Sequence, residues 1–299
     1  MAKLSLKGNI RSDKVFLAKF QMITATVAFG TIGIFRRYID LPSSVLAMAR
    51  GFIGALFLIL VLLLQKKPID KAGIRKNGFK LALTGALIGL NWVALFEAYN
   101  FTSVAKATVY YYTAPIFLII ASLIILAENL KLKKIVCVFL ALIGTVMVSG
   151  ILDKSESTEF DSTGLILGLA AALMYASVMF INKSITGINA TEKTLIQLFM
   201  AGLVMLLYSL FTGAFSGIEL TTTSIILTVI VGIFHTGFCY TLFFGAMDHL
   251  SAQSIAIFTY IDPAVAVILS ALILHEHLGI EGIIGAALVI GSALISELK

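Results

Sequence analysis

Residues 100–132 read NFTSVAKATVYYYTAPIFLIIASLIILAENLKL, and residues 248–280 read DHLSAQSIAIFTYIDPAVAVILSALILHEHLGI. Each stretch contains a turn of small residues, an apolar run with a central proline, and a glutamate where that run ends. The chain therefore carries an internal duplication, which decides how its other apolar segments are grouped. A constant offset of 148 positions aligns Ser103 with Ser251, Tyr112 with Tyr260, Pro115 with Pro263, Ser122 with Ser270, Glu128 with Glu276 and Leu130 with Leu278.

The composition of the chain indicates a membrane protein. Of its 299 residues, 59% are hydrophobic and 13% are charged, whereas soluble domains carry about 25% charged residues. So small a charged fraction cannot cover a water-facing surface, and lipid is the expected solvent. Cys137 and Cys239 lie inside apolar runs, so we expect neither a disulfide nor a metal framework. The net charge of +6 is spread over short loops, which argues against nucleic acid as a partner.

Ten apolar runs have the length of a membrane span, because a helix needs roughly 20 apolar residues to cross a bilayer. The connections between the runs are short. The longest connections are residues 65–78, which are basic, and residues 152–162, which are acidic. The expected spans are 15–35, 43–64, 79–99, 104–126, 133–151, 163–182, 194–212, 223–245, 252–274 and 280–297.

The loop charges predict that both termini lie in the cytoplasm, because cytoplasmic loops of membrane proteins carry an excess of Lys and Arg. With the N-terminus inside, sixteen of the 22 Lys and Arg residues fall in cytoplasmic segments. Five spans per half is an odd number, so the second half should enter the membrane upside down relative to the first. The Lys and Arg residues expected outside are Arg36, Arg37, Lys106 and Lys154.

Inverted repeats in an apolar chain are typical of transporters, whose substrate site lies between the repeats near the bilayer midplane. We therefore expect an all-α integral membrane protein of ten transmembrane helices, arranged as two inverted five-helix repeats. The first four helices of each half should line a central cavity. The fifth spans, at residues 135–148 and 283–295, are apolar on nearly every face, so we expect them at the periphery.

The paired proline-containing units give the chain a specific family resemblance. Over essentially all of residues 15–298 it resembles EamA-type, ten-helix members of the drug/metabolite transporter superfamily. The resemblance implies export of amino acids or related small metabolites across the plasma membrane by alternating access. It divides the chain into a cytoplasmic tail (1–14), a first repeat (15–151), an extracytoplasmic linker (152–162) and a second repeat (163–299). Its strongest parts are Pro115, Pro263, Glu128 and Glu276, with Gly144, Gly285 and Gly291 in the helices that follow.

Ionisable residues inside membrane spans are costly and therefore mark candidate functional positions. Arg50 lies two turns inside the outer end of the second expected span, and Glu97 lies near the outer end of the third. A buried Arg50–Glu97 pair would explain how either charge is tolerated. Such a pair could act as a structural gate. Alternatively, Arg50 could receive a substrate carboxylate.

Two further titratable residues are candidates for carrying coupling protons. His235 falls in the middle of the eighth expected span, and Asp262 directly precedes the central Pro263. Histidine changes charge near neutral pH. The alternatives are a neutral imidazole bonded to a nearby carbonyl and a carboxylate that caps freed backbone groups. Pro115 and Pro263 interrupt the helical hydrogen-bond ladder, and we expect each to act as a hinge beside the substrate path or as a packing kink.

Polar and aromatic side chains near the span centres complete the candidate site. Trp92 is the only tryptophan in the chain, and it is central rather than in the interfacial belt where tryptophan is enriched. A pocket of aromatic rings, an amide and a few charges suits a small zwitterion with an apolar side chain. Each tyrosine could equally be a contact between helices. The other candidates for binding substrate are Asn91, Tyr111, Tyr112, Tyr175 and Tyr240.

The sequence thus favours a secondary active transporter whose partners are a small-molecule substrate, the lipid bilayer and, as a coupling ion, protons. No Gly-rich phosphate loop and no metal-binding histidine spacing occurs, so we expect no enzyme activity and no cofactor. A multidrug exporter of organic cations is the main alternative. A membrane receptor or enzyme without transport activity is the less favoured one.

Overall fold

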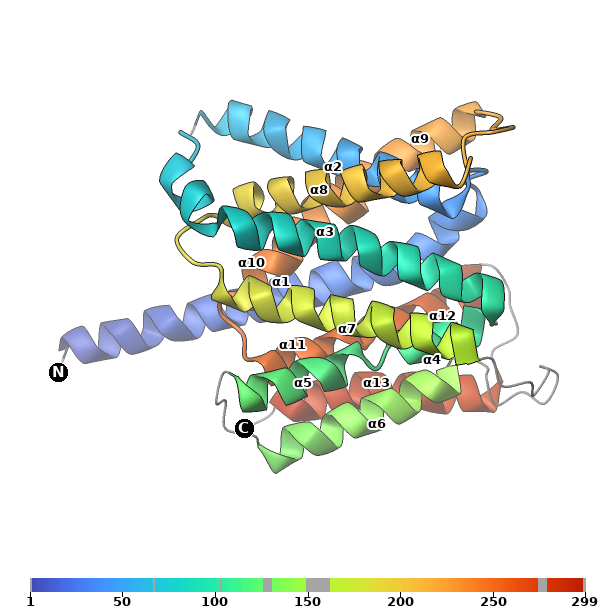
Figure 1. Cartoon of the computed structure of the whole chain (residues 1–299). Coiled ribbons are helices and arrows are strands. Elements are labelled where there is room, and N and C mark those ends of the chain that lie inside the picture. The colour runs from blue at the N-terminus through green and yellow to red at the C-terminus, as the bar shows by residue number, and fades with distance from the viewer. Residues whose placement is uncertain are drawn as a thin grey trace.

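The computed structural model describes residues 2–66, 68–102, 104–125, 131–148, 162–273 and 279–297. Glu128, Glu276 and the linker up to residue 161 lie outside these ranges. All regular secondary structure in the described ranges is helical (Figure 1). The elements are α1 (Ala2–Arg37), α2 (Ser43–Gln65), α3 (Lys71–Phe101), α4 (Val104–Tyr111), α5 (Ala114–Ile124), α6 (Leu132–Val148), α7 (Ser162–Ser184), α8 (Ala190–Phe211), α9 (Thr222–Ile230), the π-helix η1 (Val231–Phe238), α10 (Cys239–Met247), α11 (Ala252–Thr259), α12 (Ile261–Ile273) and α13 (Ile280–Glu297).

Eight helical segments in the described residues are long and apolar enough to cross a membrane. Some consist of consecutive elements: α4 and α5 form one segment, α9 to α10 another, and α11 with α12 a third. Each of the ten expected spans contains helix. The described part of α6 has only 17 residues, and the apolar part of α13, Ile280–Ser296, is too short to be counted among the eight. The membrane-spanning character is therefore clear, while ten spans with both termini in the cytoplasm stay a prediction.

The surface of the bundle is apolar, as a lipid-facing surface must be. Phe211 is 88% exposed, Leu64 82% and Phe79 81%. The interior instead contains many small side chains, such as Ala171 and Ala201, which are fully buried. Small residues between membrane helices allow the backbones to approach closely, which favours van der Waals packing where lipid offers no hydrophobic driving force.

The two halves of the chain are interlocked. Helix α3 packs against α7 and α8, α2 against α8 and η1, and α1 against α10 and α12. The last helices of the halves, α6 and α13, pack against each other at one side of the bundle (Figure 1). A Cβ atom on Gly144 would lie 2.6 Å from the Gly285 carbonyl oxygen, and one on Gly285 would lie 2.5 Å from that of Gly144. Glycine at both positions is therefore what permits this contact.

Proline interrupts one membrane segment in each half. Pro115 lacks an N–H group and lies in the first turn of α5. The Ile116 amide donates to the Thr113 carbonyl at 2.9 Å, so the Tyr112 carbonyl is left for another donor. The Tyr260 hydroxyl, from the corresponding position of the second half, donates to it at 2.9 Å. The two interrupted segments are thereby tied together inside the bundle.

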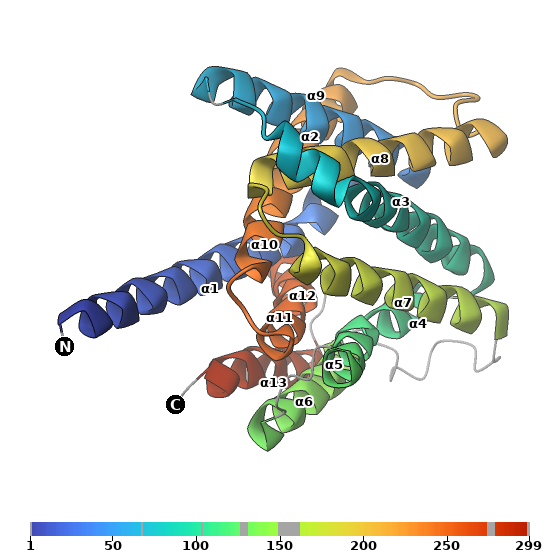
Figure 2. The same ribbon diagram turned by 60° about the vertical axis from the view of Figure 1, so that its left-hand side comes forward.

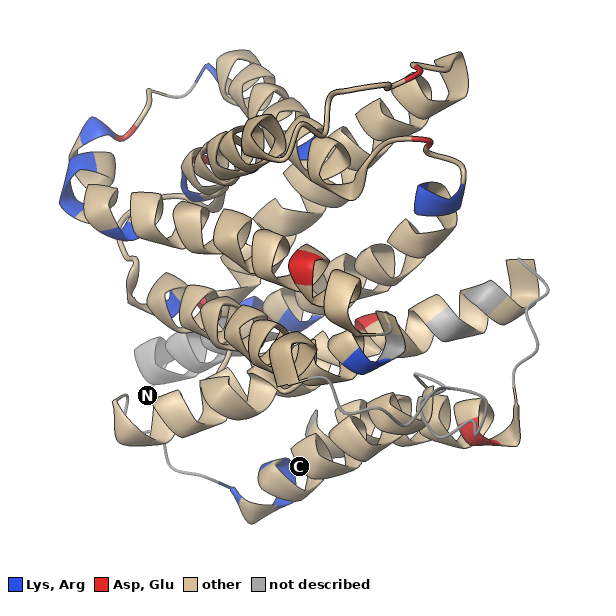
Figure 3. Cartoon of the chain, turned by 45° about the vertical axis from the view of Figure 1, so that its right-hand side comes forward, with Lys and Arg blue, Asp and Glu red and all other residues tan. Residues whose placement is uncertain are grey.

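Most Lys and Arg residues gather at one end of the bundle, which we call the basic end. Here α3, α6, α8 and α11 begin and α7 and α10 finish. In Figure 3 most of the blue segments lie on this side of the molecule. Both termini lie on the same side (Figure 2). This clustering agrees with the distribution of Lys and Arg among the loops, from which we predicted that both termini lie in the cytoplasm.

Candidate functional site

A cavity of about 200 Å³ lies between the two halves and is called the central cavity here. Helices α1 to α4 of the first half and α7, α10 and α12 of the second half contribute to its wall. Among the described residues, α6 and α13 contribute none, which agrees with their expected peripheral position. Helix α8 contributes none either, so the second half does not line the cavity with all of its first four helices, as was expected. The lining residues are Phe29, Ile32, Ala47, Arg50, Trp92, Leu95, Phe96, Tyr111, Tyr175, Tyr240 and Asp262.

Arg50 presents its guanidinium group at the cavity wall. Its guanidinium carbon lies 4.8 Å from the centroid of the Trp92 ring, a separation at which the ring face attracts a cation. Tyr240 lies beside both residues. The Nε atom of Arg50 is buried and has no hydrogen-bond partner among the described residues. A buried donor without a partner is costly, so this atom would be stabilised by an acceptor that reached it.

Tyrosine rings line the cavity together with Asp262. Tyr111 and Tyr175 stack with their centroids 5.4 Å apart and an interplanar angle of 18°. Tyr112 does not line the cavity, but its hydroxyl donates to Asp262 Oδ1. Asp262 lies in the first turn of α12, where the helix dipole favours a negative charge. The arrangement holds one carboxylate at the cavity surface.

The helix that faces Asp262 approaches it closely because of a glycine. A Cβ atom on Gly30 of α1 would lie 2.6 Å from the Asp262 carbonyl oxygen. Its neighbour Phe29 lines the cavity and packs on Tyr240 with the ring centroids 5.1 Å apart. The Phe29–Gly30 pair therefore serves both the wall of the cavity and the contact between α1 and α12.

The expected Arg50–Glu97 ion pair is wrong. Glu97 Oε1 accepts from the Tyr208 hydroxyl, and its Oε2 accepts from Asn100 Nδ2 at 3.2 Å. The reason is the rotation of α3: Glu97 is five positions after Trp92, which places the two residues about 140° apart around the helix axis. Trp92 therefore faces Arg50 and the cavity, while Glu97 faces α8.

Asn91 does not reach the cavity wall either. It is 2% exposed, and its Nδ2 atom donates to the Ala171 carbonyl of α7 at 2.6 Å. The side chain therefore joins α3 to α7. Pro115 and Pro263 are both buried at the interrupted segments described above, and neither is among the residues that line the cavity.

His235 lies in the π-helix η1, a form that is frequent at functional sites, but it does not line the central cavity. It is 1% exposed, and its Nε2 atom lies 2.8 Å from Thr31 Oγ1. Thr31 donates its own proton to the Ala28 carbonyl, so its oxygen accepts from Nε2–H. The Nδ1 atom is buried without a partner in the described residues. A second proton on this ring would have no acceptor in the observed arrangement.

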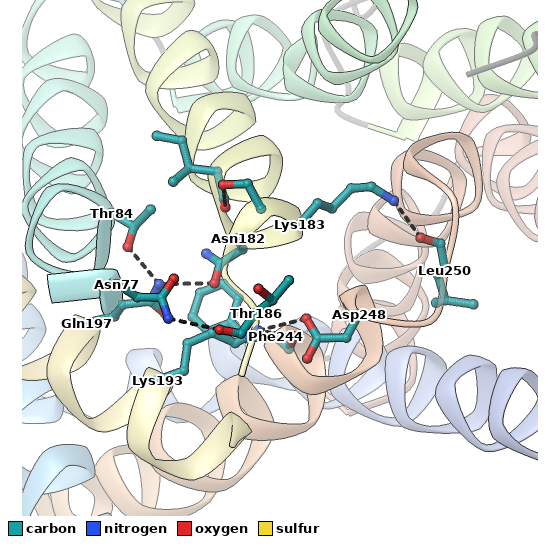
Figure 4. Close-up of polar contacts among 12 residues, drawn as sticks. Asn77, Thr84, Asn182, Lys183, Thr186, Lys193, Gln197, Phe244, Asp248 and Leu250 are labelled. Carbon is teal, nitrogen blue, oxygen red and sulfur yellow. Dashed lines mark hydrogen bonds and ion pairs between the residues drawn. The ribbon is translucent and has the colours of Figure 1, made fainter. Parts of the chain in front are cut away.

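The basic end contains a buried polar network that sequence reasoning missed (Figure 4). Lys193 falls between the expected spans 163–182 and 194–212, in a segment that was predicted to be a cytoplasmic loop. It lies instead in the first turn of α8 and is 0% exposed. Its Nζ atom lies 3.0 Å from Asp248 Oδ1 and 3.1 Å from the Phe244 carbonyl oxygen. Asn189 could have indicated this position from the sequence, because asparagine is a favourable N-cap residue. Its side chain accepts from the Glu192 amide, so α8 begins before Lys193.

Further hydrogen bonds join the helices of this network (Figure 4). Gln197 Nε2 donates to Thr84 Oγ1 at 2.7 Å and to Asn182 Oδ1 at 3.0 Å. Lys183 Nζ donates to the Leu250 carbonyl at 2.7 Å. These contacts cross-link α3, α7, α8 and the loop before α11, so they close the bundle at the basic end. Among the residues that the structure describes, no group of three His, Cys, Asp or Glu side chains could hold a metal ion.

Comparison with known proteins agrees with this architecture. The EamA-like transporter family matches residues 17–150 and 162–297, one match in each half. The "Uncharacterized transporter YxxF" of Bacillus subtilis is 30% identical over 278 residues, which are 91% of this chain and 88% of that protein. The "Uncharacterized transporter YoaV" of the same organism is 27% identical over 84% of this chain and 85% of its own length.

A solved crystal structure has the same fold, with a TM-score of 0.81 at 16% identity over 94% of this chain and 98% of the other. The twofold family match also explains the duplication in the sequence, because each half of the chain is one copy of the family's unit. The chain thus belongs to the EamA-like transporter family and is a multi-pass membrane transporter.

Proposed function

We propose that the protein is a secondary transporter that exports amino acids or related small zwitterionic metabolites by alternating access. The observation that carries this proposal is the central cavity between the two halves, which has Arg50 and several aromatic residues in its wall. An arginine fork binds a carboxylate well, and the aromatic rings around it suit an apolar side chain. The basic end would face the cytoplasm.

The contacts at the basic end close the bundle on the side that would face the cytoplasm. In the conformation described here, a substrate would therefore not reach the central cavity from that side. The network around Lys193 ties the helices together on that side, and the candidate binding residues lie beyond it. Alternating access would require these contacts to open when a substrate enters from the cytoplasm. Asp262 lies at the cavity wall, whereas His235 does not, so Asp262 is the better candidate to carry a coupling proton.

An exporter of organic cations would require a cavity with a carboxylate and no cationic group. The presence of Arg50 in the same wall favours a substrate that carries a negative group. For this reason we favour zwitterions and carboxylates over organic cations as substrates. The test below includes organic cations as an alternative result.

The test is uptake of radiolabelled amino acids into everted membrane vesicles, with and without a pH gradient, since export appears as uptake in this orientation. We expect uptake of apolar amino acids above that of vesicles without the protein. Arg50→Met should lower the affinity at least about tenfold, the lower range for a hydrogen bond to a charged group. Asp40→Asn, a change at an exposed residue, is the control. Uptake of organic cations alone, or of no amino acid, would reject the proposal.

A further inference from the structure

We infer that Asp262 is the subsite for the ammonium group of the substrate, so that the cavity requires a free ammonium and a free carboxylate on one molecule. This rests on the proposed function and specifies its substrate class. The starting observation is that Arg50 and Asp262 line the same cavity of about 200 Å³ and do not neutralise each other.

Asp262 is incompletely satisfied. An ionised carboxylate has about four acceptor positions, yet among the described residues the side chain accepts one hydrogen bond, from Tyr112. The described residues contribute no ion pair to it. A charge taken out of water requires a partner of opposite sign or further hydrogen bonds. The carboxylate therefore has the capacity and the need to bind a cation from the cavity.

The carboxylate is held in place from both halves of the chain. The Tyr112 hydroxyl binds its Oδ1 atom, and the Tyr260 hydroxyl binds the Tyr112 carbonyl at 2.9 Å. Tyr260 is fully buried. Because these contacts fix one oxygen of Asp262, the second oxygen keeps a defined position at the cavity wall, which is a requirement for selective binding.

The surroundings of Asp262 suit an ammonium group. Tyr111, Tyr175 and Tyr240 line the cavity with it, and aromatic ring faces attract cations. Arg50 is engaged with the Trp92 ring instead of with the carboxylate. The wall of the cavity therefore contains one positive group, one negative group and several aromatic rings. An α-amino acid with an apolar side chain carries the complementary pair of charges on two groups that are bonded to the same carbon atom.

The test uses Trp92 as a built-in reporter, since it is the only tryptophan and lies at the cavity. Purified full-length protein in lipid nanodiscs is titrated with L-leucine, N-acetyl-L-leucine, which lacks the ammonium, and L-leucinamide, which lacks the carboxylate. In the parent protein L-leucine should bind about tenfold to hundredfold more tightly than either derivative, the range for hydrogen bonds to charged groups.

Asp262→Asn should bind L-leucine and N-acetyl-L-leucine with affinities within about threefold of each other. It should still prefer L-leucine to L-leucinamide, because Arg50 is unchanged, and this preference also demonstrates that the variant is folded. Asp262→Glu should restore discrimination against N-acetyl-L-leucine. Asp40→Asn is the matched control at an exposed aspartate and should behave like the parent.

The inference is overturned if Asp262→Asn keeps the parental preference for L-leucine over N-acetyl-L-leucine. That result, combined with an effect of pH or Na⁺ on leucine affinity that Asp262→Asn abolishes, would restrict the carboxylate to the binding of a coupling proton or a sodium ion. With or without such an effect of pH or Na⁺, a preference for L-leucine over L-leucinamide that depends on Arg50 would still support the proposed function. Absence of any fluorescence response to amino acids, together with absence of uptake, would instead reject the proposed function itself.

Discussion

Replacing Asp248 by asparagine tests the buried network at the basic end most directly. Lys193 is 0% exposed, and its ammonium group has two partners, Asp248 Oδ1 at 3.0 Å and the Phe244 carbonyl oxygen at 3.1 Å. Asp248→Asn removes the negative charge and leaves the buried ammonium group with neutral oxygen partners only. The variant should therefore be less stable than the parent.

The size of the effect follows from the exposure of the two partners. Removing one partner of a buried ion pair costs about 3–5 kcal/mol, because the other charge is left uncompensated. The Asp248 side chain is 36% exposed, so water can replace part of the lost interaction. We therefore expect a loss near the lower end, about 3 kcal/mol. Removing both charges, in Lys193→Met/Asp248→Asn, should bring the protein within about 1 kcal/mol of the parent.

The assay is equilibrium unfolding in mixed micelles with increasing dodecyl sulfate, followed by far-ultraviolet circular dichroism. Lys80→Met is the matched control, because the Lys80 ammonium donates to the Ser184 carbonyl at 3.3 Å in an exposed position. Its loss should cost less than about 1 kcal/mol. Stability of Asp248→Asn within 1 kcal/mol of the parent, or a double variant as unstable as the single one, would refute the reasoning.

Two further predictions concern the helix contact at the periphery and the coupling group. Gly285→Ala should lower the free energy of unfolding by about 1–3 kcal/mol, because its Cβ atom would lie 2.5 Å from the Gly144 carbonyl oxygen. Gly291→Ala, which meets no atom within 4 Å, should leave stability unchanged or raise it in the same assay. In everted vesicles Asp262→Asn should lose the stimulation of transport by a pH gradient, while His235→Gln should keep it. The opposite result would assign coupling to His235.

Sequence reasoning located several residues of the central cavity because their chemistry excludes a position in lipid. Arg50, Trp92 and Tyr240 are charged or polar groups within apolar runs, so each had to face protein or a cavity. This argument needs only the depth of a residue in its span. Depth follows from counting residues along a helix, and for that reason it can be inferred without knowledge of the neighbouring helices.

The partners of polar side chains were less predictable from the sequence. Glu97 was expected to pair with Arg50 but binds Tyr208, which lies 111 positions away in the chain. Lys193 was assigned to a loop but is buried against Asp248, 55 positions further on. In both cases the outcome depends on how each helix is rotated about its axis, and a span that is apolar on most faces carries no strong signal for that rotation.

The sequence by itself determined that the chain spans a membrane, that it consists of two related halves, and which residues could form a polar interior. These properties depend on local hydropathy and on an internal repeat, both of which are read along the chain. Only the tertiary structure decided that Asp262 binds Tyr112, 150 positions away, and faces the same cavity as Arg50. Such contacts depend on the close packing of helices that are distant in sequence, where a few glycines set how near the backbones approach.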